Sequence, residues 1–229
     1  MGQFINLTAA DGFGFSAYVA QPQSTPKAAV VVLQEIFGVN THIQSVADRF
    51  AAQGYLAIAP ATFERVKTGV SLGYTDADMT AGFGLKSAVD ALPEPGVMLD
   101  IQAAIDHAAQ ASSGKVGIVG FCWGGLLTWR AACALRGLSA AVPYYGGGMT
   151  AEDEAARTPQ CPVMAHFGDQ DHWIPLEGVT AFAKTHPEVE VHVYAANHGF
   201  NCEQRGSFNE AAAALASERT LAFFAAHLG

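Results

Sequence analysis

The sequence has few basic residues, few charged residues of any kind and no long apolar run. Twelve lysines and arginines stand against 21 acidic residues, which gives a formal net charge of −9, and only 14% of the 229 residues are charged. Nucleic acids and anionic membranes attract basic patches, so neither is an expected partner. No apolar run reaches the length of a membrane span, and Met1–Asp11 lacks both a basic flank and a long apolar stretch. We therefore expect neither a transmembrane helix nor a signal peptide.

The four cysteines, at positions 122, 133, 161 and 202, lack both metal-ligand spacing and the density of a disulfide scaffold. No pair of histidines has zinc-site spacing with a third ligand, so we expect no metal and no cofactor. A reducing cytoplasm is the simplest location for free thiols. Half of the residues are hydrophobic, which is enough for one large core. The prediction is a cytoplasmic protein with one domain over residues 1–229, as a monomer or a small homo-oligomer.

Short apolar runs alternate with longer stretches of helical periodicity. Ala28–Leu33 and Lys115–Phe121 are apolar along their length, as is typical of strands covered on both faces. Strands separated by helices indicate parallel neighbours joined by crossovers. The pattern predicts an α/β fold with an open, mostly parallel sheet and helices on both faces. Gln3–Leu7 and Gly14–Ala20 predict a hairpin at one edge. Further strands are expected at Tyr55–Ala59, Ala140–Tyr145, Val163–Phe167 and Glu190–Tyr194, and helices at Thr41–Gln53, Val97–Ala111, Trp123–Arg136, Leu176–His186 and Ser207–Leu228.

The stretch Thr62–Pro95 is the least regular part of the chain, with many glycines and weak periodicity. In a compact α/β domain, a segment of this length usually carries function or covers a site. A short helix with irregular flanks is the alternative interpretation.

The strongest local motif is Gly120-Phe121-Cys122-Trp123-Gly124-Gly125, which follows a predicted strand and opens a helix. It matches the G-x-S-x-G nucleophile elbow with cysteine in the serine position. Glycines at the first and fifth positions let neighbouring elements approach the strained turn. The helix N-terminus favours a thiolate. The alternative is an inert buried cysteine, but the context favours Cys122 as a nucleophile.

A cysteine nucleophile needs a base, and the base needs an acid that orients it. In this arrangement the acid and the histidine follow later strands. The loop Gly168–Pro175 offers Asp169 and Asp171, and we favour Asp171 because it lies deeper in the loop. Asp169 fits a turn or a helix cap. His198 alone occupies the loop after the last strand. Four other histidines lie on predicted helices or at their ends and are expected at the surface: His42, His107, His186 and His227.

The loop Gln34–Asn40 follows the first buried strand and is expected to supply an oxyanion donor. The predicted donors are the backbone N–H groups of Ile36 and Trp123. Glu35 is a carboxylate directly after an apolar strand, and burying it is costly without a partner. It could hold the proton of the thiol or form a salt bridge at the mouth of the site, and its position does not decide between these roles.

Together these segments resemble the dienelactone hydrolase family of α/β-hydrolases over nearly the whole chain, and Glu218–Leu221 fits as well. The resemblance implies an α/β-hydrolase fold and hydrolysis of a lactone or activated ester without a cofactor. Matched residue by residue, it implies a triad of Cys122, Asp171 and His198. It also implies that Glu35 accepts the thiol proton when substrate binds, and that the resting cysteine is neutral.

Four residues are candidate substrate contacts: Phe37, Trp173, Phe200 and Arg205. In lactone-cleaving members of the family, two arginines bind a carboxylate of the substrate. One would lie in Tyr74–Lys86, which contains no arginine. The other would lie four residues after His198, where this chain has Cys202, with Arg205 three residues further on. The resemblance therefore predicts the chemistry better than the substrate.

Two other classes of function compete with an ester hydrolase. One is a small-molecule-binding protein on a hydrolase scaffold that has lost turnover, although the intact triad argues against it. The other is a thiol redox protein, but Cys122 has no resolving cysteine nearby in the sequence.

Overall fold

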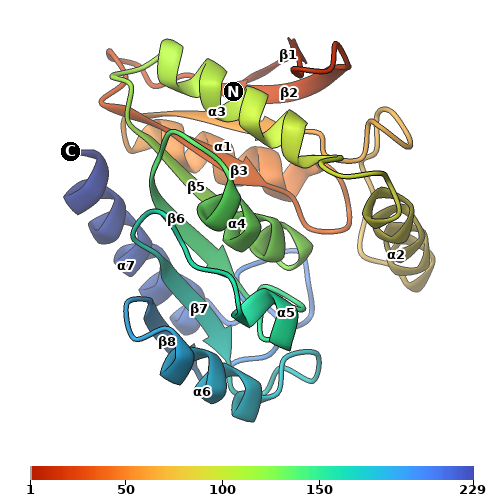
Figure 1. Cartoon of the computed structure of the whole chain (residues 1–229), viewed down its shortest axis with the longest axis vertical. Helices are drawn as coiled ribbons and strands as arrows, with labels where there is room; N and C mark the ends of the chain where they lie inside the picture. The colour runs from red at the N-terminus through yellow and green to blue at the C-terminus, as the bar shows by residue number, and fades with distance from the viewer. Residues whose placement is uncertain (1) are drawn as a thin grey trace.

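The structure, a computed structural model, describes residues 2–229 and contains one eight-stranded sheet. The strand order is β1-β2-β4-β3-β5-β6-β7-β8 (Figure 1). Every neighbouring pair from β4 to β8 is parallel, whereas the β1–β2 hairpin is antiparallel and joins β4 in antiparallel register. This confirms the predicted mostly parallel sheet with a hairpin at one edge. The strands are β1 Gln3–Thr8, β2 Gly14–Ala20, β3 Ala28–Leu33, β4 Tyr55–Pro60, β5 Val116–Phe121, β6 Leu138–Tyr144, β7 Met164–Gly168 and β8 Glu190–Tyr194.

Helices cover both faces of the sheet (Figure 1). On one face α1 and α7 meet through Phe50 and Phe224, whose ring centroids are 6.0 Å apart. On the other face α4 and α6 meet through Trp129 and Phe182, at 5.1 Å. The helices are α1 Thr41–Ala52, α2 Asp76–Asp90, α3 Met98–Gln110, α4 Trp123–Ala134, α5 Glu152–Ala155, α6 Leu176–Thr185 and α7 Glu210–Leu228. None of the helices in residues 2–229 has the length and apolar character needed to cross a membrane.

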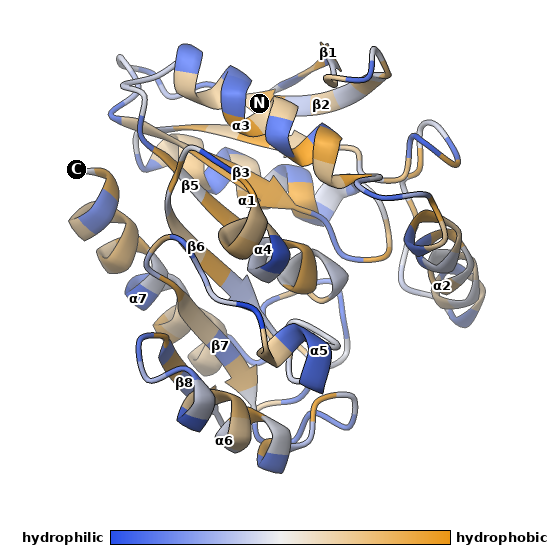
Figure 2. Cartoon of the chain, viewed as in Figure 1, coloured by the Kyte–Doolittle hydropathy of each residue, from blue (hydrophilic) through white to orange (hydrophobic). Residues whose placement is uncertain are grey.

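The central strands owe their position to their composition. Every residue of β3, β4 and β5 is buried, as apolar strands between two helical layers require. Figure 2 shows hydrophobic residues concentrated in these strands and hydrophilic residues on the outer sides of helices such as α3 and α6. The carboxyl ends of the parallel strands therefore emerge together from a rigid core, which is where α/β folds place their sites.

Helix α2 departs from this pattern. It begins with a capping box, in which the Thr75 hydroxyl accepts from the Asp78 backbone N–H and the Asp78 carboxylate accepts from the Thr75 N–H. Of its fifteen residues only Gly82 and Val89 are buried, and it stands apart from the sheet (Figure 1). The irregular stretch 62–95 thus contains a helix of considerable length. The sequence did not predict its bounds, because its apolar residues form no wide stripe.

Two histidines that we expected at the surface are buried, so that prediction was wrong for them. His42 is 1% exposed and His186 is 5% exposed. His42 lies on the inward side of α1, with its ring edge-on to Phe121. His186 ends α6 against Trp129, with ring centroids 5.1 Å apart. Both are at helix ends that turn towards the core rather than towards solvent.

Candidate active site

Cys122 lies on the turn between β5 and α4 in a strained backbone conformation, with φ 56° and ψ −118°. A positive φ in a residue other than glycine costs about 1–3 kcal/mol, so the surroundings must hold it. They do so through close packing. A Cβ at Gly120 would collide with the carbonyl of Gly124 and the hydroxyl of Thr128, and a Cβ at Gly124 would collide with the carbonyl of Gln34. Glycine at both positions therefore lets α4 rest directly on β3 and β5.

His198 and Asp171 form the pair that the triad requires. The Nδ1 atom of His198 lies 2.7 Å from Oδ2 of Asp171, and both side chains are buried. The other carboxylate oxygen of Asp171 accepts from the backbone N–H groups of Trp173, at 2.8 Å, and Ile174, at 3.2 Å. Asp169 is exposed at the surface of the same loop. The structure thus brings Asp171, and not Asp169, to the histidine.

Cys122 and His198 line the same cavity. Burial lowers the pKa of His198, but the sulfur of Cys122 and the carboxylate of Asp171 outweigh burial and raise this pKa to about 10. The buried imidazole is therefore a stronger base than a free histidine. At neutral pH it therefore carries a proton that it can give to a leaving group, and only after giving it up can it take one from water.

Ile36 and Trp123 also line this cavity. Trp123 is the first residue of α4, where backbone N–H groups have no partner in the preceding turn. Within residues 2–229 neither the Ile36 nor the Trp123 amide donates a hydrogen bond to the protein. Two free amides beside a nucleophile are the elements of an oxyanion hole.

The irregular stretch 62–95 contacts the loop that carries Ile36 and holds it in place. The Leu72 N–H donates to the Phe37 carbonyl at 2.8 Å, and Gly38 pairs with Ser71. Gly38 has φ 82°, and a Cβ there would collide with the carbonyl of Val70. At the other contact, Gly82 of α2 sits so close to the Ile36 carbonyl that a Cβ would collide with it. The irregular stretch therefore contributes to the shape of the site.

Glu35 is buried beneath the cavity, 1% exposed, between two donors. Tyr74 donates its hydroxyl hydrogen to Oε2 at 3.2 Å, and Arg205 donates from a guanidinium nitrogen to Oε1 at 3.3 Å. Burial raises the pKa of Glu35, although Arg205, His198 and Tyr74 act in the opposite direction. The carboxyl therefore keeps a proton more readily than a free glutamate. Of the two roles left open by its position, the salt bridge is present in the structure.

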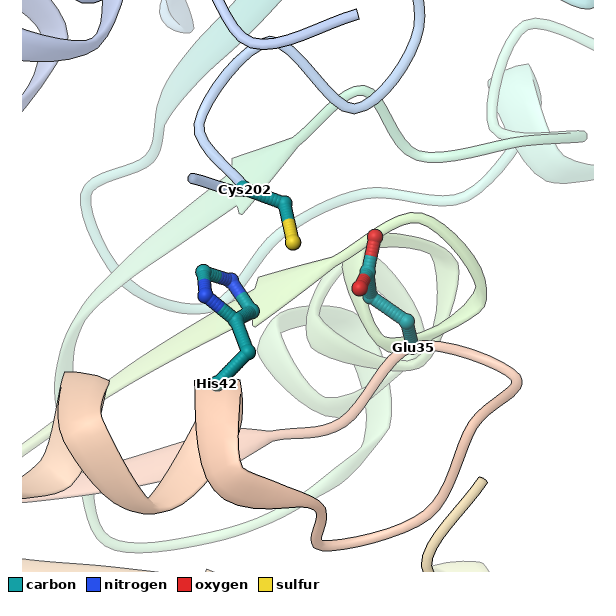
Figure 3. A group of neighbouring side chains, drawn as sticks. All are labelled: Glu35, His42 and Cys202. Carbon is teal, nitrogen blue, oxygen red and sulfur yellow. The ribbon is translucent and has the colours of Figure 1, made fainter. Parts of the chain in front are cut away.

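Glu35 also meets His42, which lies seven positions later in the chain, and Cys202, which is distant in the sequence (Figure 3). One potential ligand atom of each lies within 4.8 Å of the others. Burial lowers the pKa of His42 to about 4, and burial together with Glu35 raises the pKa of Cys202 to about 11. The set has ligand spacing that the sequence could not show. The guanidinium of Arg205 against Glu35 opposes a further cation, so we assign no metal to these residues.

The cavity above Cys122 has a volume of about 310 Å³ and a mostly apolar lining. Three of the four candidate substrate contacts line it, namely Phe37, Trp173 and Arg205. Phe200 lies in the core instead, fully buried against Tyr145 with ring centroids 5.2 Å apart. The lining is Ile36, Phe37, Met79, Phe83, Lys86, Cys122, Trp123, Gly147, Gly148, Trp173, His198 and Arg205.

Besides Gly147 and Gly148, three lining residues were not among the predicted site residues: Met79, Phe83 and Lys86. All belong to α2, and their spacing of four and three residues places them on one face of that helix. This spacing was the available signal. Lys86 also brings a second cation to the cavity; it is paired with Asp90 at 2.6 Å, as Arg205 is with Glu35 at 3.3 Å. The anion-binding groups that appeared to be missing from the sequence therefore have two candidates in the structure.

The sheet order, the strained cysteine after β5 and the His–Asp pair after the later strands define an α/β-hydrolase. The dienelactone hydrolase family profile matches residues 15–228. The chain is 36% identical over 230 residues to a carboxymethylenebutenolidase from Pseudomonas putida, covering 96% of this chain and 95% of that protein. A crystal structure described as a putative dienelactone hydrolase from Klebsiella pneumoniae is similar with a TM-score of 0.82 and 32% identity, over 97% of this chain and 99% of that one. The chain belongs to the dienelactone hydrolase family and is a hydrolase with a small-molecule substrate.

Proposed function

We propose that this single-domain protein hydrolyses a lactone or another activated carboxylic ester through an acyl-enzyme on Cys122. The observation that carries the proposal is the convergence of Cys122, His198 and two free amides on one cavity. The carboxymethylenebutenolidase names of the relatives support a lactone substrate. Lys86 and Arg205 beside the cavity favour a substrate with an anionic group.

In the first step the sulfur of Cys122 attacks the ester carbonyl and a C–S bond forms. The charge that develops on the carbonyl oxygen lies against the Ile36 and Trp123 amides, and losing one such donor costs about 3–4 kcal/mol in a well-studied hydrolase. The C–O bond of the ester then breaks, and protonated His198 gives its proton to the leaving alcohol. In a lactone this alcohol stays attached to the acyl group.

In the second step water attacks the thioester, and His198 accepts a proton from it as a general base. The C–S bond breaks, the acid leaves and the sulfur is regenerated. Asp171 holds the imidazole in the required orientation and stabilises its protonated form throughout. The balance is one ester and one water consumed, and one acid and one alcohol formed.

Glu35 restrains the nucleophile in this proposal. A negative charge near Cys122 raises the cost of ionising the sulfur, whereas His198 favours the thiolate. In the resting enzyme the proton stays on the sulfur of Cys122, and Glu35 is paired with Arg205. Because Glu35 is buried and its pKa is raised, it is suited to accept that proton once substrate binds. A substrate that engages Arg205 would loosen the Glu35–Arg205 pair and release the thiolate.

The test is turnover of a panel of lactones and activated aryl esters at neutral pH by the wild type and by Cys122→Ala. We expect Cys122→Ala to lose at least about 10⁴-fold in kcat with an unchanged circular dichroism spectrum. Substantial turnover by Cys122→Ala would show that the nucleophile is another group. Binding without turnover by the wild type would favour the small-molecule-binding alternative.

We also propose a cytoplasmic location, because all four cysteines are free thiols.

A further inference from the structure

Trp173 is exposed in a way that the other tryptophans are not. Its exposed fraction is 68%, whereas Trp123 is 1% and Trp129 is 0% exposed. Its backbone N–H is held by Asp171 at 2.8 Å, so the residue is anchored while its ring lies in water. A large apolar side chain held in solvent at the rim of a cavity is a feature of ligand-binding surfaces.

Phe83 also lines the cavity, and its ring contacts that of Trp173. The two ring centroids are 5.8 Å apart with an interplanar angle of 43°, and Phe83 is 39% exposed. Phe83 comes from α2 and Trp173 from the loop after β7, so the pair joins two separate segments that line the cavity with Cys122. The residue before Phe83 is Gly82, which seats α2 on the Ile36 carbonyl. This contact links the position of Phe83 to the loop 34–40, which carries the predicted oxyanion donor Ile36 and is called the oxyanion loop below.

We infer that the contacting rings of Trp173 and Phe83 act together as an aromatic clamp, which selects esters carrying one flat aromatic ring by packing against that ring. This inference rests on the proposed hydrolase function and specifies its substrate class. A cavity of about 310 Å³ is at the lower end of the range for small-molecule sites, about 300–1,000 Å³. It therefore has room for an ester with a single ring. Aromatic rings attract one another in offset or edge-to-face contact more strongly than saturated rings of similar size do.

The experiment compares esters that differ only in the flatness of the ring. One pair carries the ring on the acid: trifluoroethyl phenylacetate and trifluoroethyl cyclohexylacetate. The other carries it on the alcohol: benzyl methoxyacetate and cyclohexylmethyl methoxyacetate. For at least one pair we expect the wild type to prefer the aromatic member by roughly 3- to 10-fold in kcat/KM. Trp173→Ala and Phe83→Ala should bring that ratio close to one.

Phe4→Ala is the matched control, because Phe4 is 53% exposed on the edge strand β1 and does not line the cavity. It should leave the ratio unchanged. Equal losses on both members of each pair, or no preference in the wild type, would overturn the clamp even if every ester is hydrolysed.

A binding measurement separates this inference from the proposed function. In Cys122→Ala, trifluoroethyl phenylacetate should shift tryptophan fluorescence more than trifluoroethyl cyclohexylacetate does, and Trp173→Ala in the same background should abolish that difference, although Trp123 also lines the cavity. If the wild type hydrolyses no ester but the difference persists, the hydrolase proposal fails and the clamp stands. If Trp173→Ala instead dissociates a dimer in sedimentation while the ester ratio stays unchanged, Trp173 serves an interface between copies and the clamp is wrong.

Discussion

The carboxyl ends of the central strands are tightly packed. The stretch 62–95 that covers them is packed loosely. At the strand ends Cys122 is held by glycine contacts with almost no free space, and Asp171 and His198 are buried. The covering helix α2 buries only Gly82 and Val89 and turns Met79, Phe83 and Lys86 towards the cavity. In the proposed mechanism the reacting groups thus depend on a rigid core, and the groups proposed to contact the remainder of the substrate depend on a loosely packed helix. Changes in the first region should affect kcat, and changes in the second should affect the choice of substrate.

The largest expected effect comes from the rigid region. Asp171→Asn keeps an oxygen for the Trp173 and Ile174 amides but turns an amide donor towards His198, which forces the wrong tautomer. We expect kcat to fall by about 10³- to 10⁴-fold, as in the corresponding change in a serine protease. Asp169→Asn, on the exposed part of the same loop, is the control and should keep nearly all activity. The reverse ranking in steady-state kinetics would transfer the role to Asp169.

The second prediction tests the contact between the two regions. A methyl group in Gly82→Ala collides with the Ile36 carbonyl, so the helix or the oxyanion loop must move. A displacement of the order of 1 Å at a reacting group can cost about 10²-fold, and we expect a loss of about 10- to 100-fold in kcat/KM.

Gly84→Ala is matched to this change, because it lies on the same helix and a Cβ there has no atom within 4 Å. It should leave activity intact and stabilise the protein by up to about 1 kcal/mol through helix propensity. Equal activities of the two variants would mean that α2 does not position the oxyanion loop.

The third prediction concerns Glu35, which lies beneath the cavity. Glu35→Gln removes a charge that opposes ionisation of Cys122 but keeps the shape. The free enzyme should react with iodoacetamide several-fold faster, while ester turnover falls several-fold because Arg205 loses its partner. The measurement is the pH dependence of alkylation with peptide mapping of the modified residue. If alkylation and kcat both stay at wild-type values, Glu35 is a structural ion-pair partner only.

The last prediction concerns stability in acid and not activity. The pKa of His42 is about 4 in the folded protein, against an ordinary value of 6.5 for a histidine in the unfolded chain, so the unfolded chain binds a proton first as the pH falls. The contribution of neutral His42 to stability is complete above pH 6.5 and is lost towards pH 4. Between pH 7 and pH 5 this amounts to about 2 kcal/mol. The measurement is urea unfolding at pH 7 and at pH 5. Between these pH values the free energy of unfolding of His42→Phe should fall by about 2 kcal/mol less than that of the wild type. Equal losses would show that His42 is not a source of acid sensitivity.

The sequence predicted those parts of the molecule that local patterns determine. β3 and β5 are wholly apolar, and the elbow glycines lie within four residues of one another, so both the sheet and Cys122 could be identified. The Glu35–Arg205 pair joins residues 170 positions apart, and no local pattern contains it.

The features that the sequence failed to predict are also those that no local pattern determines. Helix α2 has too few buried residues to show an apolar stripe. The burial of His42 depends on how α1 packs against Phe121, and Phe200 could not be told from a cavity residue because it directly follows the His198-Gly199 turn.

The central claim is that an acyl group passes through Cys122, and intact-protein mass spectrometry tests it most directly. The wild type is mixed with an activated ester, quenched with acid after short intervals and weighed, and the adduct is located by peptide mapping. We predict one acyl adduct on Cys122 that forms early and disappears as the ester is consumed, and none in Cys122→Ala. Rapid hydrolysis with no adduct on Cys122 at any interval, or a lasting adduct on another residue, would contradict the account.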